Sequence, residues 1–321
     1  MLKRAPLALA MLCIGGMGML TLGAPAALAA GLACGTTITT NTVLTADVTG
    51  CSGVGIIIGA DGITLDLKGH TVSGTGADPS NGILVAFHHD VVITNGTVSG
   101  FWYGVVADTS TGVTVSKITA LDNIRGINFS NTSASLITKS VASSSGLDGI
   151  RLDGYGTHDN RVTQSQANGN VWGITISNGA HDNLVDRNTV TDNQFGLPLF
   201  SGTTSNTILR NSVSGNVSYG ILVTTSAETA VVQNSIYGNG TDGVVVDGSA
   251  SDTTLLQNDA SYNGADGFRV GSASTTITKN TATYNVALGI EAVDGVTDGG
   301  GNVAYGNGDS AQCAWVTCTT L

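Results

Sequence analysis

Apolar and polar positions follow one another in this chain in a pattern that returns every 22 to 24 residues. Each repeat has a glycine, an apolar residue directly after it, and a second apolar residue two positions further on. The glycines are Gly82, Gly104, Gly126, Gly149, Gly173, Gly196, Gly220, Gly243, Gly267 and Gly289. A repeat this short cannot bury an apolar face alone, so neighbouring copies must stack. The pattern therefore predicts a solenoid.

Short apolar runs rich in Val, Ile and Thr, separated by polar turns, indicate two or three strands in each repeat. Parallel strands joined by a crossover are almost always connected with a right-handed turn. We therefore expect an all-β fold, a right-handed parallel β-helix solenoid of about ten coils with 22 to 24 residues each. A left-handed hexapeptide helix, a leucine-rich repeat and a calcium-binding nonapeptide solenoid lack their sequence patterns here.

Asparagine recurs at two positions of the repeat. Asparagines at the corners of stacked coils can pass side-chain hydrogen bonds from one coil to the next, which satisfies buried turn groups. One expected row contains Asn95, Asn188, Asn211, Asn234, Asn258 and Asn280, and the other contains Asn193, Asn216, Asn239, Asn263 and Asn285.

The two ends of the chain differ from the repeats. Residues 1–29 resemble a signal peptide, with Lys3 and Arg4, an apolar stretch, and small residues before Ala30. We expect an N-terminal cap over 30–60, the β-helix over 61–300 and a C-terminal cap over 301–321. The signal peptide predicts export to the periplasm, the cell surface or the medium. We expect no transmembrane segment in the mature chain. A lipoprotein acylated at Cys34 is the alternative.

Four cysteines remain after the signal peptide, namely Cys34, Cys51, Cys313 and Cys318. An even number of cysteines in an exported chain predicts disulfides. Because a solenoid keeps its ends apart, the expected pairs are the two local ones, Cys34 with Cys51 and Cys313 with Cys318.

The formal charge of the chain is −11, with 23 acidic and 12 basic residues. This balance disfavours nucleic acid and anionic membranes as partners, because both need clustered Lys and Arg. A surface rich in Gly, Ser, Thr and Asn suits a polysaccharide partner, although the excess of Asp also fits turn chemistry.

Several segments carry a resemblance to a known family: Asp61–His70 at the entry, the coil unit Arg210–Val213 with Tyr219–Ile221, and Gly299–Asn302 with the cysteine tail. With them the chain resembles the secreted pectate-lyase-like proteins with generic parallel β-helix repeats. The resemblance implies the fold; the activity stays open, because members are lyases, hydrolases, epimerases or proteins without known activity. The motifs of polygalacturonases are absent. The clustered soft ligands expected of the copper-related β-helix proteins of denitrifiers are absent too.

Aromatic residues precede four of the repeat glycines. Stacked coils place such residues in one row, where their rings can bind the apolar faces of sugars. The expected sugar-binding residues are Tyr103, Trp172, Phe195 and Tyr219. Packing of the rings against one another is the alternative interpretation.

A polar cluster precedes the aromatic row and is the candidate catalytic site. It contains Arg125, Asp148, Arg151, Asp153, Tyr155 and His158, and all of these except Tyr155 are the candidate catalytic residues. A polyuronate lyase or epimerase needs a base for the C5 proton and positive charge on the sugar carboxylate. Arg151 or His158 would serve as base or clamp, and Asp148 and Asp153 would hold calcium if the protein binds it; no cofactor is required. Surface charge pairing is the alternative.

Two further pairs recur at equivalent places in successive coils. Asp242 and Asp266 have the spacing of a glycosidase pair, but each belongs to an ordinary Asp-Gly turn. His158-Asp159 and His181-Asp182 offer two imidazoles to a transition metal, or simply cap their loops.

The sequence predicts an exported β-helix protein, expected to be monomeric, that binds polysaccharide along a stacked face with little or no catalysis. The alternatives are a lyase or epimerase acting on uronic-acid polymers, and a structural or adhesive rod.

Overall fold

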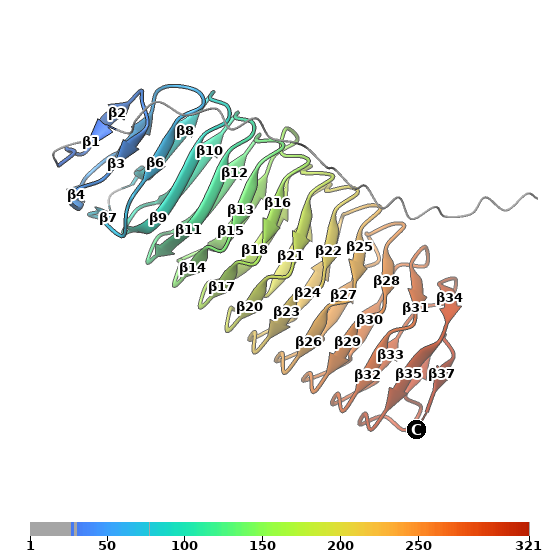
Figure 1. Ribbon diagram of the computed structural model, residues 1–321. Helices are drawn as coiled ribbons and strands as arrows, with labels where there is room; N and C mark the ends of the chain where they lie inside the picture. Colours follow the sequence, from blue (N-terminus) through green and yellow to red (C-terminus); the bar gives the residue numbers. More distant parts are fainter. Residues whose placement is uncertain (1–26, 29–30, 77, 321) are drawn as a thin grey trace, which may run out of the picture.

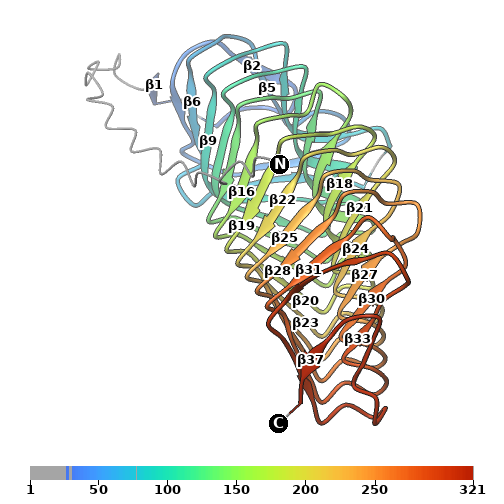
Figure 2. The ribbon, with the colours of Figure 1, turned by 90° about the vertical axis from the view of Figure 1, so that its right-hand side faces the viewer.

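The computed structural model describes residues 27–28, 31–76 and 78–320, and every regular element within them is a β-strand. The strands form two parallel sheets of 24 and 13 strands. Figures 1 and 2 show the coils stacked along one axis, with the first coils in blue and the last in red. The predicted all-β parallel solenoid is confirmed.

The 13-stranded sheet contributes one strand to each coil. Ten of its strands contain or directly follow a repeat glycine, and β2, β5 and β36 lie outside the glycine pattern. The solenoid therefore has more turns than the ten expected, because the predicted caps also coil. The strands are β2 Thr36–Ile38, β5 Ile56–Ile58, β8 Asn81–Ala86, β10 Tyr103–Asp108, β12 Arg125–Ser130, β15 Asp148–Asp153, β18 Trp172–Ser177, β21 Leu197–Phe200, β24 Ile221–Val223, β27 Val244–Val246, β30 Phe268–Val270, β33 Ile290–Glu291 and β36 Cys313–Ala314.

The 24-stranded sheet forms the other two sides of the coil as two columns, joined where β9 Val92–Ser99 and β11 Thr114–Leu121 run through both. The first column holds β1 Ala27–Leu28, β3 Thr42–Val43, β6 Thr64–Asp66, β13 Leu136–Thr138, β16 Arg161–Thr163, β19 Leu184–Asp186, β22 Thr207–Leu209, β25 Ala230–Val232, β28 Thr254–Leu256, β31 Thr276–Thr278 and β34 Thr297–Gly300. The second holds β4 Val48–Cys51, β7 Thr71–Gly74, β14 Val141–Ser143, β17 Gln166–Asn168, β20 Thr189–Thr191, β23 Ser212–Ser214, β26 Ser235–Tyr237, β29 Asp259–Ser261, β32 Thr281–Thr283, β35 Asn302–Tyr305 and β37 Cys318–Thr319.

The core consists of apolar side chains that are aligned from one coil to the next. Ile127 pairs with Ile150, and Ile150 pairs with Ile174, so equivalent residues of successive coils lie directly over one another. All three side chains are fully buried. Burying aligned apolar side chains in this way supplies the main stabilising free energy of the solenoid.

The repeat glycine allows successive coils to approach closely. A Cβ atom on Gly220 would lie 2.6 Å from the carbonyl oxygen of Gly243, and one on Gly196 would lie 2.3 Å from that of Gly220. Any larger residue would push the coils apart, so the glycine is required by the close packing of backbones.

Buried asparagines form ladders along the corners. Both nitrogens of Asn188 donate to the Oδ1 atom of Asn211, at 2.9 and 3.0 Å, and the Nδ2 atom of Asn211 donates to the carbonyl of Val185 at 2.9 Å. Asn302 extends the first predicted row, and Asn170 and Asn307 extend the second. Both nitrogens of Asn307 donate to the Oε1 atom of Gln312, which ends that ladder.

Two details of the ladders differ from the expectation. Asn95 is outside the row, because it occupies the left-handed corner one residue before the ladder position and donates to Asp66. A third ladder, Asn160 to Asn183 to Asn206, follows the strands of the 13-stranded sheet and has only three members.

Both predicted disulfides are present. The Cα atoms of Cys34 and Cys51 are 5.4 Å apart, and those of Cys313 and Cys318 are 6.2 Å apart. Most of the predicted signal peptide lies outside the described residues. Within the residues that are described, no helix is long and apolar enough to cross a membrane.

Candidate functional site

The outward face of the 13-stranded sheet carries the candidate site. Residues directly before the repeat glycine, and the second and fourth after it, point away from the core, because side chains alternate along a strand. The register confirms the predicted row, since Tyr103 pairs with Arg125, Asp148 with Trp172, and Trp172 with Phe195. Figure 2 shows these strands stacked side by side along the solenoid.

An arginine network, defined by Tyr103, Arg125, Asp148, Arg151 and Asp153, occupies the N-terminal part of this face. Arg125 donates from Nε to Asp148 Oδ2 at 2.9 Å and from Nη1 to the hydroxyl of Tyr103 at 3.0 Å. Arg151 donates from Nη2 to Asp153 Oδ1 at 2.9 Å, and its Nη1 atom lies 3.7 Å from Asp148 Oδ2. The structure thus brings together four of the five residues predicted as catalytic.

Polar neighbours from the next coil hold Asp153 in place. Its Oδ1 atom accepts hydrogen bonds from Ser177 and Asn178, both at 2.8 Å. Arg151 also donates from Nε to the hydroxyl of Ser177 at 3.3 Å. Asp148 and Asp153, the carboxylates expected to hold calcium, therefore bind guanidinium groups instead, and a calcium ion would have to compete with Arg151 for both.

Asp148 lies at the boundary between this network and the aromatic residues, and its side chain has no exposed surface. Among the described residues its Oδ1 atom has no hydrogen-bond partner, and neither has the hydroxyl of Thr175, which pairs in register with Arg151. Unpaired buried oxygens lower stability. Thr175 lies on β18, the strand of Trp172, and Asp148 lies on β15, the preceding strand of the same sheet.

The environment of Arg125 keeps it charged. Burial lowers the pKa of its guanidinium, but the hydrogen bond and charge of Asp148, together with Tyr103, outweigh this effect and raise the pKa above its ordinary value. The network therefore presents two guanidinium groups, each already matched by a carboxylate.

An aromatic surface follows in the next coils. The ring of Trp172 meets that of Phe200 edge to face with centroids 5.7 Å apart, and the rings of Phe195 and Tyr219 are tilted with centroids 5.1 Å apart. These rings line a shallow cavity of about 310 Å³. The members of the aromatic surface are Trp172, Phe195, Pro198, Phe200, Tyr219 and Leu222.

Three of the four predicted sugar-binding aromatics share this surface, and Tyr103 does not. Arg125 lies over the Tyr103 ring at 5.5 Å, so that ring belongs to the arginine network. The sequence interpretation missed Phe200, which occupies the fourth position after Gly196 rather than the position before it. Because side chains alternate between the two faces of a strand, the position of Phe200 four residues after Gly196 already predicts that it lies on the outward face.

The rings of the aromatic surface contact one another, as the packing interpretation predicts, yet each keeps part of its surface exposed. Burial raises the pKa of the Tyr219 hydroxyl, with a smaller opposing effect of Arg269. Partly exposed rings beside polar side chains can stack on a sugar while hydroxyl groups are hydrogen-bonded nearby.

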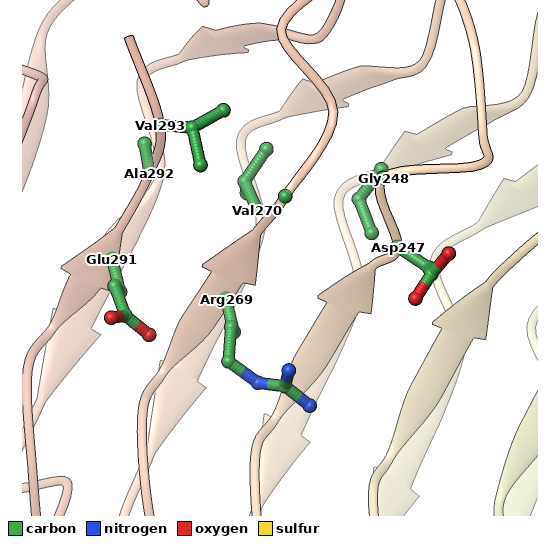
Figure 3. Close-up of a pocket in the computed structure, with 9 residues that line it drawn as sticks. Asp247, Gly248, Arg269, Val270, Glu291, Ala292 and Val293 are labelled. Carbon is green, nitrogen blue, oxygen red and sulfur yellow. The ribbon is translucent and has the colours of Figure 1, made fainter.

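An acidic region lies at the C-terminal end of the same face. Asp242 accepts a hydrogen bond from the backbone N–H of Asp266 at 3.1 Å and one from Arg269 Nε at 3.0 Å. Burial, followed by the proximity of Glu291 and Asp242, raises the pKa of Asp266 to about 6. Figure 3 shows Arg269 and Glu291 on adjacent strands, with Asp247 on the other side of Arg269.

His158, the fifth residue predicted as catalytic, lies outside the arginine network. Its Nδ1 atom is 2.8 Å from Asp159, and its ring stacks on that of His181 with centroids 5.0 Å apart. His181 in turn lies 2.7 Å from Asp182. The recurring His-Asp pairs thus form a stacked ladder at the turn that leads into the 24-stranded sheet.

Two family models match the sequence. The model described as periplasmic copper-binding protein (NosD) matches residues 34–219, and the model described as right handed beta helix region matches residues 185–309. The second match agrees with the predicted handedness. No curated protein matches the sequence.

The described residues do not provide a copper site. Each of the five histidines has its Nδ1 atom within 3.1 Å of an aspartate, and four cysteines form disulfides. All four methionines precede residue 20, before the described part of the chain. In that described part, no group of three His, Cys, Asp or Glu side chains is arranged to hold a metal ion. Copper favours imidazole and sulfur ligands, so this donor set does not fit it.

Solved structures with the same fold include enzymes and an adhesin. The periplasmic alginate epimerase AlgG is 16% identical with a TM-score of 0.63, covering 84% of this chain and 78% of its own. The A-module of mannuronan C-5 epimerase AlgE6 from Azotobacter vinelandii is 17% identical with a TM-score of 0.55, covering 89% of each chain. The surface adhesin PfbA of Streptococcus pneumoniae is 11% identical with a TM-score of 0.56, covering 85% of this chain and 83% of its own.

At these sequence identities, the similarity to the solved structures shows only that the fold is shared. Membership of a family is shown by the match of a family model to the sequence. Because the NosD model spans residues 34–219, more than half of the 321 residues, the chain belongs to the NosD family of periplasmic copper-binding proteins.

Proposed function

We propose that this protein is an exported glycan-binding protein whose ligand lies along the outward face of the 13-stranded sheet. The observation that carries the proposal is the aromatic surface, in which Trp172, Phe195 and Tyr219 occupy the same position in three successive coils. Coils repeat at about 4.8 Å. This spacing is close to the length of one pyranose unit, so consecutive sugars can meet consecutive rings.

The polar groups beside the rings complete such a site. Arg125 and Arg151 precede the aromatic surface, and Asp242 and Arg269 follow it on the same face. Glycan sites combine apolar ring faces with a few fixed donors and acceptors, and this face offers both.

Catalysis has less support than binding. In the arginine network Asp148 has no exposed surface, and His158 lies at another turn. A lyase or epimerase needs an accessible base beside the groups that hold the sugar carboxylate. An absorbance screen for unsaturated uronides on polyuronates tests this alternative, and product formation that Arg151→Ala abolishes would establish it.

Export is supported by the two disulfides, which persist in oxidising compartments. The family description as periplasmic and the predicted signal peptide agree with it.

The test is glycan-array screening followed by calorimetry on the best ligand. Trp172→Ala and Tyr219→Ala should each weaken binding about tenfold, since a buried aromatic anchor contributes about 1–2 kcal/mol. Tyr262→Ala is the matched control, because Tyr262 is 64% exposed but follows β29 of the other sheet. A purely structural rod would show no glycan binding, or binding that neither aromatic substitution changes.

A further inference from the structure

Building on the proposed function, we propose that the glycan carries free amino groups: the face binds an amino-sugar polysaccharide in preference to a neutral or uronic-acid polymer. The inference depends on how charge is distributed over the two sheets, together with the cavity beside the aromatic surface. Charge complementarity determines which of several similar partners a surface accepts.

Acidic side chains outnumber basic ones on the proposed binding face. After Arg4 the sequence contains ten basic residues, and three of them, Arg125, Arg151 and Arg269, lie on the outward face of the 13-stranded sheet. The other seven belong to the strands of the 24-stranded sheet or to the corners between them. They are Lys68, Lys117, Lys139, Arg161, Arg187, Arg210 and Lys279.

Each arginine of the face is already matched by an aspartate. Arg125 contacts Asp148 at 2.9 Å, Arg151 contacts Asp153 at 2.9 Å, and Arg269 contacts Asp242 at 3.0 Å. Four acidic side chains of the same face have no basic partner within ion-pair distance among the described residues. They are Asp108, Asp247, Asp266 and Glu291.

Two of these carboxylates line one cavity. Asp247 and Glu291 are exposed, and with Arg269 between them they line a cavity of about 230 Å³ (Figure 3). Hydrogen bonds from the hydroxyl and backbone of Ser249 lower the pKa of Asp247, so it stays ionised. The cavity therefore presents two negative charges beside an arginine that Asp242 already neutralises.

One oligosaccharide can reach both parts of the face. Five coil steps separate Trp172 from the coil of Glu291, which is about 24 Å at the usual strand spacing. A hexasaccharide has this length, so sugars stacked on the rings would continue into the acidic cavity. Because Asp247 and Glu291 lie two coils apart with Arg269 between them, two ammonium groups on different sugars of one chain would each gain a carboxylate partner, whereas uronates there would meet like charge.

Three β-1,4-linked hexasaccharides of different charge provide the test: glucosamine, its N-acetylated form, and mannuronate. Calorimetry at about pH 6 keeps Asp247 ionised, because hydrogen bonds from Ser249 lower its pKa. Each exposed ion pair strengthens binding about two- to fivefold. The glucosamine hexamer should therefore bind about tenfold more tightly than its N-acetylated form. The double variant Asp247→Asn with Glu291→Gln should reduce this difference to less than about twofold.

Asp159→Asn is the matched control, since Asp159 is an exposed acid at another turn. Equal affinity for the two glucosamine hexamers, or tighter binding of the mannuronate hexamer, would overturn the inference. If the N-acetylated hexamer binds and Trp172→Ala weakens that binding about tenfold, the proposed function stands even when acetylation has no effect. If no hexamer and no array glycan binds, the proposed function fails as well.

Discussion

Arg125 donates its Nε hydrogen to Asp148 over 2.9 Å, and the aspartate that accepts it has no exposed surface at all. A carboxylate is tolerated at such a place only with a charged partner, because transfer of an unpaired charge from water is very unfavourable. The contact thus fixes Arg125 beside Tyr103 on the outward face of the 13-stranded sheet.

Replacing the buried carboxylate should destabilise the protein. Asp148→Ala leaves Arg125 and Arg151 without their shared partner, and breaking a buried pair costs about 3 kcal/mol. Urea unfolding followed by circular dichroism measures the change. Asp159→Asn is the control because its side chain is 67% exposed and Asn tolerates the left-handed backbone of this position, so it should change the free energy of unfolding by less than about 0.5 kcal/mol. Equal effects of the two substitutions would contradict this account.

The repeat glycine should be far more sensitive than a glycine of the cap. In Gly220→Ala the new Cβ atom would lie 2.6 Å from the Gly243 carbonyl oxygen, and pushing the coils apart should cost about 2 kcal/mol. Gly53→Ala is the matched control, since nothing lies within 4 Å of its Cβ position. Thermal unfolding of both variants tests the prediction, which is wrong if Gly220→Ala unfolds at the wild-type temperature.

Removing one asparagine from the middle of a ladder should leave several buried groups unpaired. Asn211 accepts from both nitrogens of Asn188 and donates to Val185, so Asn211→Ala should lower the free energy of unfolding by about 3 kcal/mol. Gln257→Ala, at an exposed corner, should change it by less than about 0.5 kcal/mol. Denaturant titration of the two variants gives the comparison, and a stable Asn211→Ala protein would show that the ladder contributes little.

Asp266 should make stability fall as the pH rises. Its pKa is raised from 3.8 to about 6 in the folded protein, so between these values the folded state holds a proton that the unfolded state has released. The free energy of unfolding therefore decreases with rising pH across this window. Asp266→Asn removes this dependence and still offers an oxygen to the N–H of Leu288.

The measurement is the difference in unfolding free energy between Asp266→Asn and the wild type, taken from pH 4 to pH 7. This difference should grow in favour of the variant up to about pH 6 and then become constant. A difference that is independent of pH would mean that Asp266 titrates normally in the folded state.

The architecture was predictable because coil length is nearly constant. A glycine every 22 to 24 residues fixes which residues align, so the register of Trp172 with Phe195 followed from counting. The same counting misplaced Asn95 by one position. A strand continuous through a corner, as in β9, shifts the asparagine relative to its neighbours, and only backbone geometry reveals this.

The candidate site was predictable only in part. The row before the glycine contains Trp172 and Tyr219, but Phe200 reaches the same surface from a different position of the strand. Such contacts depend on the length and direction of the side chains. For the same reason the Tyr103 hydroxyl accepts a hydrogen bond from Arg125, and among the described residues its ring does not contact the rings of the aromatic surface. The placement of the other seven basic residues on the strands and corners of the 24-stranded sheet needed the coil cross-section, which the repeat period alone does not define.

Gln312 accepts hydrogen bonds from both nitrogens of Asn307, the last asparagine of the second ladder, and so ends that ladder without an unpaired amide. A duplicated coil inserted anywhere before Asn307 would lengthen the ladder, and Gln312 would still end it. Removing Gln312 instead would leave both nitrogens of the buried Asn307 without their acceptor at the end of the ladder.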